Sequence, residues 1–364
     1  FLLFRFLTGA GIGGEYGAVN SAIQELIPAR RRGYTDLAIN GSFWIGAALG
    51  AVGSIIVLDP ELVDQRWGWR AAFVIGGLLA LVIIYVRRFI PESPRWLMTH
   101  GRVAEAEAVV AQIEQRVQAR TGKPLASIDH LPPLRLRFMQ TSWSHIAGTI
   151  LARYPRRTVL CVVLMATQAF CYNAIFFTYA LILTRFYGVA PASVGWFILP
   201  FALGNVLGPL LLGPLFDSIG RRIMIASTYG LAGALLCLTG WLFSIGAFDA
   251  TSQTIAWTVI FFFASAGASA AYLTVGECFP LETRAVTISL FYAFGTLVGG
   301  VGGPALFGAL IDSGERTQVL WGYLLGGGLM ILAAFVAAAL GISAERKPLE
   351  EVAEPLSMVR DRTT

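Results

Sequence analysis

The chain has 364 residues, of which 56% are hydrophobic and only 13% are charged. A soluble domain carries about 25% charged residues, so this composition excludes an ordinary soluble enzyme and predicts an integral membrane protein. The formal net charge of +5 does not indicate nucleic-acid binding, because the basic residues lie in loops between apolar segments.

Apolar segments long enough to cross a bilayer recur from the first residue onward. A spanning helix needs about 20 apolar residues. Nine segments meet this length and predict an all-α membrane fold, at about 3–27, 37–58, 69–90, 158–183, 192–215, 222–246, 254–276, 285–311 and 319–341. The first segment starts without Met and lacks the basic region and cleavage site of a signal peptide. We therefore expect a fragment of a longer chain.

The longest connection, residues 91–157, contains all three histidines and much of the charge. Within it, residues 102–120 place Ala, Val and Ile at helical spacing between charged side chains, which predicts an amphipathic helix beside the membrane. The expected organisation is an N-terminal bundle (1–90), a cytoplasmic linker (91–157), a C-terminal six-helix bundle (158–341) and a cytoplasmic tail (342–364).

The basic residues assign the two sides of the membrane. When the loops are alternated, 22 of the 27 Lys and Arg residues fall on one side, four fall on the other, and Arg5 lies within a span. Because cytoplasmic loops carry an excess of Lys and Arg, the first side is predicted to be cytoplasmic. The linker and the C-terminus are then both inside the cell.

An internal repeat relates the two parts of the chain. Glu25, Pro28 and Arg32 follow the first span, and Glu277, Pro280 and Arg284 follow the seventh at a constant offset of 252 residues. Repeated bundles with a central substrate site are typical of secondary transporters. A six-helix second copy implies a six-helix first copy, of which three helices are present, giving nine of twelve in two bundles.

Five motifs lie at corresponding helix positions along the chain. They are Arg5 to Glu15, Glu25 to Gly33, Pro91 to Leu97, Gly213 to Arg222, and Glu277 to Arg284. Together they resemble motifs of the major facilitator superfamily, specifically its sugar porter and metabolite–proton symporter branch, over essentially the whole chain. The resemblance implies the major facilitator fold, without its first three helices, and transport by alternating access.

The charged motif residues are expected to form a gate at the cytoplasmic helix ends. Exposed ion pairs contribute only about 0–1 kcal/mol each, but a network that separates as a unit can bias a two-state equilibrium. Any single charge could instead be a solvated helix end. The predicted gate residues are Glu25, Arg32, Glu92, Arg95, Asp217, Arg221, Arg222, Glu277 and Arg284.

The resemblance also suggests substrate-binding residues within the spans. Gln168 and Asn173 match amide positions of helix 7 in sugar porters, whereas Thr167 replaces a further glutamine. By position, three more residues join them: Asn40, Asn205 and Tyr272. Amides suit hydroxyl-bearing or carboxyl-bearing ligands because each can both donate and accept hydrogen bonds. Hydrogen bonding between helices without ligand contact remains the alternative.

Proton coupling is predicted to use carboxylates, because no histidine lies within a span. Arg5 and Glu15 both fall in the first span, about 15 Å apart at 1.5 Å rise per residue, which is too far for a direct bond. A buried carboxylate is a plausible proton carrier, and Glu15 is the first candidate. Asp36 is the second candidate, with helix capping as its alternative role.

Several other functions fit the sequence less well. The glycines Gly9, Gly11 and Gly14 satisfy a dinucleotide fingerprint, but that motif requires a strand and a turn before its helix. The four cysteines lack metal-ligand spacing, and no cofactor is expected. We therefore predict a monomeric, multi-pass secondary transporter in the inner membrane, whose partners are a small polar metabolite, a proton and the lipid bilayer. A uniporter, an exporter and a non-transporting sensor remain alternatives.

Overall fold

A computed structural model describes residues 2–57, 61–89, 91–125 and 142–358. The N-terminal helices are α1 (Leu2–Leu26), α2 (Arg32–Gly41), α3 (Phe43–Val57) and α4 (Gln65–Arg87), with a 3-10 turn, η1, at Ala29–Arg31. Two shorter helices follow, α5 (Pro94–Thr99) and α6 (Val103–Thr121). Ser93 caps α5 by accepting from the Trp96 backbone N–H, and Gly122 ends α6 with φ of 63°.

The second part of the chain begins with α7 (Trp143–Gly148) and a π-helical turn, η2 (Thr149–Arg153). Its long helices are α10 (Val194–Ser218), α11 (Arg221–Ser244), α12 (Ala250–Cys278) and α15 (Arg316–Leu340). Two further spans are interrupted by π-helical turns. They comprise α8 (Pro155–Cys171), η3 (Tyr172–Phe176) and α9 (Tyr179–Tyr187), and α13 (Leu281–Thr296), η5 (Leu297–Val301) and α14 (Gly302–Asp312). The remaining elements are η4 (Pro191–Ser193) and α16 (Leu349–Val352).

The described residues contain eight helical segments that are long and apolar enough to cross a membrane. They correspond to eight of the nine predicted spans. The remaining prediction corresponds to α1, which is a 25-residue helix. Arg5, Glu15 and several glycines make α1 less apolar than the others. A helix, α6, covers the segment 102–120 that was predicted to be helical, from Val103 onward.

The core lies among the C-terminal helices α8–α15, with α12 at its centre. From Ala264 to Phe279 of this segment, every residue is buried. Close approach of the helices depends on glycine: a Cβ at Gly299 would collide with the backbone of Ala169 and Phe170. Small residues of this kind allow membrane helices to pack backbone to backbone.

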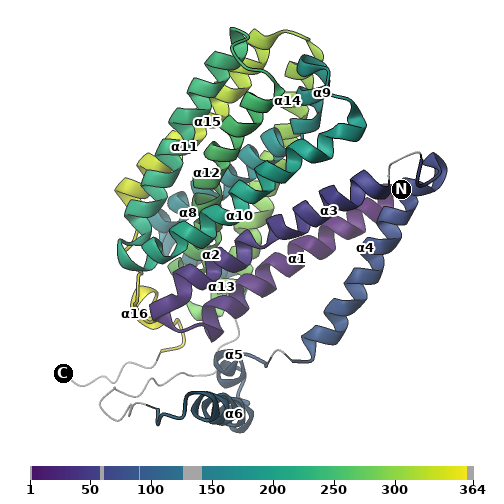
Figure 1. The fold of residues 1–364 in the computed structure, drawn as a ribbon. Coiled ribbons are helices and arrows are strands. Elements are labelled where there is room, and N and C mark those ends of the chain that lie inside the picture. Colours follow the sequence, from purple (N-terminus) through teal and green to yellow (C-terminus); the bar gives the residue numbers. More distant parts are fainter. Residues whose placement is uncertain (1, 58–60, 90, 126–141, 359–364) are drawn as a thin grey trace.

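The N-terminal helices α1–α3 lie against α10, α12 and α13, whereas α4 stands apart (Figure 1). We call the lower end in this view the charged end; there α1 ends and α2, α11 and α13 begin. Residues 2–12 of α1 are exposed, but Gly17, Asn20, Ile23 and Gln24 are buried. The first helix therefore contacts the C-terminal helices only in its last turns, and the two groups of helices meet mainly toward the charged end.

Candidate functional site

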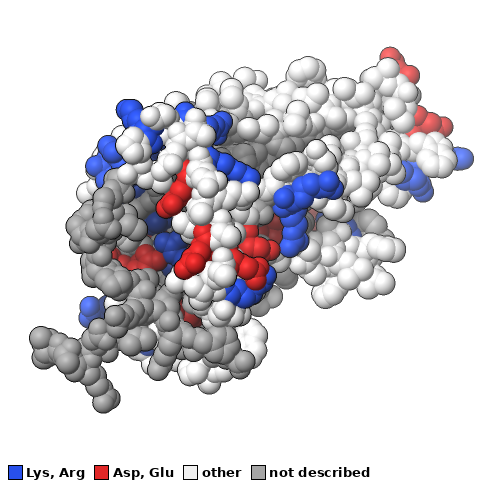
Figure 2. All heavy atoms as spheres, turned by 90° about the horizontal axis from the view of Figure 1, so that it is seen from below, with Lys and Arg blue, Asp and Glu red and all other residues white. Residues whose placement is uncertain are grey.

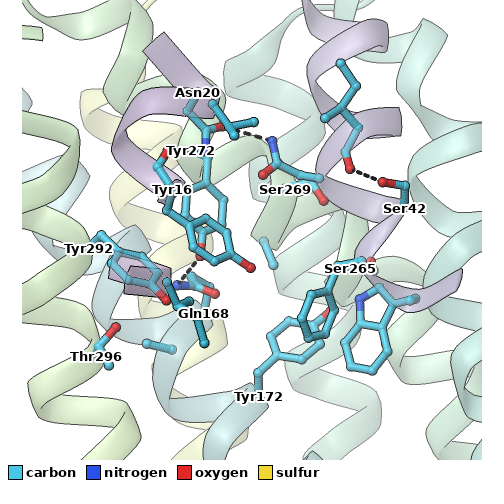
Figure 3. A pocket seen from close by; sticks show the side chains of 18 of the residues that line it. Tyr16, Asn20, Ser42, Gln168, Tyr172, Ser265, Ser269, Tyr272, Tyr292 and Thr296 are labelled. Carbon is cyan, nitrogen blue, oxygen red and sulfur yellow. Dashed lines mark hydrogen bonds between the residues drawn. The ribbon is translucent and has the colours of Figure 1, made fainter. Parts of the chain in front are cut away.

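A cavity of about 700 Å³ lies between the N-terminal and the C-terminal helices. Its wall comes from α1, the α2–α3 junction, α8, η3, α12 and α13 (Figure 3). Both the size and the mixed lining are typical of a small-molecule site, because such cavities combine apolar walls with a few placed polar groups.

Three tyrosines form an aromatic stack on one side of the cavity. Tyr16 of α1 stacks on Tyr272 of α12 and on Tyr292 of α13, with ring centroids 5.4 and 4.7 Å away and interplanar angles of 22° and 17°. The other two rings also contact each other, with centroids 6.2 Å apart. The stack joins the N-terminal and C-terminal helices through ring contacts rather than through charges. Its faces and edges offer a flat apolar surface with hydroxyl groups at the rim.

Polar groups face the same cavity from α8, η3, α12 and α13. The Gln168 Nε2 donates to Tyr272 Oη at 3.2 Å, and the Asn173 Nδ2 donates to the Ala169 carbonyl at 2.7 Å. Ser265, Ser269 and Thr296 add hydroxyl groups to the lining. These side chains can donate to and accept from a polar ligand.

The predicted substrate residues divide into two groups. Asn40, Gln168, Asn173 and Tyr272 line the cavity. Asn205 lies outside the lining and is fully buried, where it accepts from the Tyr172 hydroxyl at 2.8 Å. Asn205 therefore holds Tyr172, which lines the cavity, and a change at Asn205 would reach a ligand through that tyrosine.

Several lining residues were missed by the sequence analysis. The main ones are Tyr16, Asn20, Trp44, Tyr172, Ser269 and Tyr292. A signal was present on α1, because Tyr16, Asn20 and Gln24 are spaced by four and share one helix face. The π-helical turn η3 gave no such signal in the sequence, although turns of this kind frequently occur at functional sites.

A buried ion cluster lies at the charged end. The guanidinium of Arg221 binds Glu277 with both Nε and Nη2, at 3.2 and 3.1 Å, and its Nη1 lies 3.0 Å from Asp217. Arg32 reaches the same Glu277 at 3.5 Å. These four side chains are only 1–8% exposed, so the cluster is shielded from solvent.

This cluster joins the N-terminal helices to the C-terminal helices. Arg32 belongs to α2, whereas Asp217, Arg221 and Glu277 belong to α10, α11 and α12. The Asp217 carboxylate also accepts from the backbone N–H groups of Gly33 and Tyr34, at 3.0 and 2.8 Å. An anion stabilises a helix N-terminus, so Asp217 caps α2 from the other group of helices.

A second, less buried set of contacts surrounds the cluster. Arg95 of α5 donates to the Glu25 backbone carbonyl and to Glu350 of α16, both at 2.8 Å. Ser93 donates to the Glu25 carboxylate. Burial disfavours the ionised Glu350, but the charge and hydrogen bond of Arg95 outweigh it and lower the pKa of that carboxyl. Figure 2 shows acidic and basic side chains gathered on this end of the molecule.

The other predicted gate residues do not share the ion cluster. Arg284 is buried and donates to the Phe279 carbonyl at 3.4 Å, with its Nε and Nη1 unpartnered among the described residues. Arg222 donates to the Ala338 carbonyl of α15 at 2.6 Å. Glu92 is exposed and makes no ion pair within the described ranges.

The three predicted proton-coupling residues have different environments. Arg5 is exposed on the first turns of α1, and Glu15 lines the cavity with an exposed side chain. Asp36 of α2 is fully buried and accepts hydrogen bonds from Gln24 and Asn40, at 2.7 and 2.8 Å. The capping alternative does not apply to Asp36, because its carboxylate accepts from side-chain amides rather than from the N-terminal N–H groups of α2.

A family model described as "Sugar (and other) transporter" matches residues 1–356 of the chain. The chain belongs to this transporter family. The family predicted from the sequence motifs is therefore confirmed, and so is the all-helical, multi-pass membrane fold. This member of the sugar transporter family is a secondary transporter rather than an enzyme, and its substrate is a small molecule.

Two curated proteins are related to this family member with the same sequence identity. The niacin transporter NiaP of Acinetobacter baylyi is 26% identical over 355 residues, which cover 96% of this chain and 75% of NiaP. The putative metabolite transport protein YdjK of Escherichia coli is 26% identical over 357 residues, which cover 96% of this chain and 73% of YdjK.

Among solved structures, the proton:xylose symporter XylE bound to 6-bromo-6-deoxy-D-glucose superposes with a TM-score of 0.73. It is 21% identical, and the match covers 97% of this chain and 73% of XylE. The similarity shows that the helices of this chain have the major facilitator arrangement.

Proposed function

We propose that the protein is a proton-coupled symporter that carries a small polar metabolite across the inner membrane by alternating access. One observation carries this proposal: the 700 Å³ cavity lies between two groups of helices that are joined at one end by a buried ion cluster. Breaking that cluster would open the cavity toward the charged end without requiring the helices themselves to unfold.

The charged end is assigned to the cytoplasm. Twenty-two of the 27 Lys and Arg residues fall on this side when the loops are alternated, and an excess of such residues marks cytoplasmic loops. With Arg32 bound to Glu277, the structure is closed toward the cytoplasm. The tail containing α16 then lies inside the cell, and the exposed apolar helix faces of a monomer contact lipid.

The predicted gate residues have graded roles in this proposal. Arg32, Asp217, Arg221 and Glu277 form the part that must separate, because among the described residues they are the buried ion cluster that spans the two groups. The Glu25–Arg95–Glu350 contacts add a weaker outer layer. Glu92, Arg222 and Arg284 remain at the charged end outside these ion pairs and would act through the long-range field or through helix packing.

The cavity supports sugars, polyols and organic acids as the substrate class. Gln168 and Asn173 supply amides, and the Tyr16 stack supplies an apolar face for a ring. The names of the relatives are consistent with this range, because one is a niacin transporter and XylE is a xylose symporter. The proposal therefore covers compounds that combine a ring with hydroxyl or carboxyl groups.

The proposal is tested with the protein expressed from its complete gene and reconstituted into proteoliposomes. The panel consists of xylose, mannitol, nicotinate and benzoate, supplied under an inward proton gradient. We expect accumulation of one member above equilibrium together with acidification of the interior. Equilibration without acidification would indicate a uniporter, and the absence of uptake and counterflow for every member would contradict the proposed function.

A further inference from the structure

A ladder of polar side chains connects the cavity to the ion cluster. On α1, Asn20 and Gln24 are four residues apart, and on the antiparallel α2, Asn40 and Asp36 are four residues apart. Residues at this spacing share a helix face, so the two pairs lie opposite each other. Asn40 Nδ2 donates to Asn20 Oδ1 at 3.0 Å, and Gln24 Nε2 donates to Asp36 Oδ2 at 2.7 Å.

The two ends of this ladder belong to the two functional regions. Asn20 and Asn40 line the cavity, and Figure 3 shows Asn20 at its wall. Arg32 lies one turn before Asp36 on α2 and binds Glu277. Asp36 is therefore one helical turn from the cavity wall and one turn from the gate.

Asp36 is a buried carboxyl group held by amides. Its Oδ1 accepts from Asn40 at 2.8 Å and its Oδ2 accepts from Gln24, and the side chain is fully buried. Within the described ranges it makes no ion pair. The charged groups that act on it are Glu277 on α12 and Arg221 on α11, and Arg32 and Asp217 belong to the same ion cluster.

Gln24 connects Asp36 to the C-terminal helices. Its side chain lies directly on Gly276, where a Cβ would come within 2.6 Å of Gln24 Cγ, and Gly276 precedes Glu277 of the ion cluster. The Oε1 of Gln24 is buried with no hydrogen-bond partner among the described residues. The amide is thus held between a carboxyl group and the α12 backbone with one hydrogen-bonding position unused.

We propose that Asp36 is the group whose protonation couples the cavity to the gate. In the first step, a proton enters from the cavity past Asn40, which lines the wall, and binds Oδ1, while the hydronium ion that supplied it becomes water. When the ion cluster separates, Asp36 is exposed on the other side and gives the same proton to water there. The inference rests on the proposed function, because it names the group that carries the proton in that transport cycle.

Protonation also changes the cavity wall through Asn40. The ionised carboxylate accepts from Asn40 Nδ2, but a protonated Oδ1 must donate to an acceptor. A half-turn of the Asn40 amide presents its oxygen to Asp36. The Asn20 amide must then turn as well, giving up its bond to the Tyr16 carbonyl in order to donate to Asn40. The proton on Asp36 therefore sets which hydrogen-bonding groups of Asn20 and Asn40 are available to a substrate.

Glu15 lacks these connections although it faces the cavity. It is exposed and makes no hydrogen bond or ion pair within the described ranges, so its charge state is not linked to the α2–α12 contact. A carboxylate that remains in contact with water in the cavity can attract a cation. It has no structural route by which to sense whether the gate is open.

The test compares Asp36→Asn with Glu15→Gln, which removes the other cavity-side carboxylate. Both are assayed with the best-transported member of the panel, first by counterflow at equal pH and then by accumulation under a proton gradient. We expect Asp36→Asn to keep at least about half of the wild-type counterflow but to lose accumulation and acidification completely. Because Glu15 lines the cavity, its variant is judged by coupling alone: Glu15→Gln should keep acidification and the wild-type ratio of accumulation to counterflow, whatever its own counterflow rate.

Accumulation by Asp36→Asn at the wild-type ratio would overturn the inference while leaving the proposed transporter intact. Equal loss of accumulation in both variants would also overturn it. A wild-type protein without counterflow would instead remove the proposed function, and the inference with it.

A second variant covers the case in which Asp36→Asn does not reach the membrane. Gln24→Leu leaves both the carboxyl group and the cavity lining unchanged, but it removes one donor to the carboxylate. Because that donor favours the ionised form, its loss should move the pH midpoint of transport upward. An unchanged midpoint, with normal expression, would contradict the role of Asp36.

Discussion

The cavity and the charged end join the same two groups of helices in different ways. At the charged end, Arg32 and Arg221 converge on Glu277 in a buried cluster of opposite charges. At the cavity, Tyr16 stacks on Tyr272 and Tyr292, and few direct polar bonds cross between the groups. When one ion pair of a buried cluster breaks, the remaining charges lose a shared partner, so the pairs tend to separate together. Stacked rings can slide over one another by small steps without leaving a charge unpaired. The difference suggests that one region switches and the other adapts to a ligand.

The largest effect on stability and transport is expected when the shared carboxylate at the centre of the ion cluster is removed. Glu277→Gln leaves Arg32 and Arg221 buried without their shared counter-charge. Breaking a buried pair on one side typically costs about 3–5 kcal/mol, so we expect loss of thermal stability and of accumulation. Thermal unfolding and uptake in proteoliposomes measure the two effects. The matched control Glu105→Gln, in an exposed pair with Arg102, should change neither; an equal loss in both variants would show that the cluster has no special role.

Asp217→Asn weakens only one part of the ion cluster, so its effect can be compared with that of Glu277→Gln. The amide keeps an oxygen for the Gly33 or Tyr34 N–H groups but loses the ion pair with Arg221. We expect a loss of about 1–2 kcal/mol in unfolding free energy, which is smaller than for Glu277→Gln. Asp217→Ala should cost more, because the cap of α2 is also lost. Equal stability of the two Asp217 variants would contradict the capping role.

At the cavity, changes should affect affinity more than stability. Tyr16→Leu removes the α1 ring that the cavity offers to a ligand ring, and aromatic pairs contribute about 0.5–1.5 kcal/mol beyond their buried area. We expect KM to rise about 2-fold to 12-fold, by the relation of about 1.4 kcal/mol per factor of ten. Tyr16→Phe keeps the ring and should stay near wild type. A large loss of stability with unchanged KM would show that the stack serves structure alone.

The smallest effect is expected in the outer layer of the charged end. The pKa of Glu350 lies below its usual value because of Arg95, so the pair stabilises the protein above about pH 4.3, the ordinary glutamate value. This stability is lost as the pH falls through the lowered pKa of the folded state. The side chains are 34% and 22% exposed, so less than about 1 kcal/mol is expected. Glu350→Gln should remove this acid-dependent part of the thermal stability; an unchanged pH profile would assign the pair no role.

The charged end could be predicted in good part from the sequence. Charges between apolar spans can lie only near helix ends, so Arg32, Asp217 and Glu277 were placed at one end of the molecule without knowledge of the packing. Their partners could not be assigned, because helix rotation decides which charges meet. Arg222 shows this limit: it adjoins Arg221 in sequence but contacts α15 instead of the cluster.

The cavity was predicted less completely, for two physical reasons. Resemblance supplied the amides Gln168 and Asn173, but the phase of each helix determines whether a polar residue faces the cavity or a neighbouring helix. Asn205 therefore proved to support Tyr172 from behind. The π-helical turns within the spans containing η3 and η5 also shift this phase, and the apolar pattern does not reveal them.

The most direct test of the switching role is a distance measurement across the charged end. Spin labels at Arg31→Cys before α2 and Ser218→Cys at the end of α10 are both exposed and lie on opposite groups of helices. A control pair at Ser218 and Thr251 lies within the C-terminal helices and should keep its distance. We predict one short distance for the first pair in the absence of substrate, and a second, longer population when substrate and protons are supplied. Glu277→Gln should populate the longer distance without substrate. A single unchanged distance under all conditions, in a protein that transports, would contradict the proposal that this cluster is the gate.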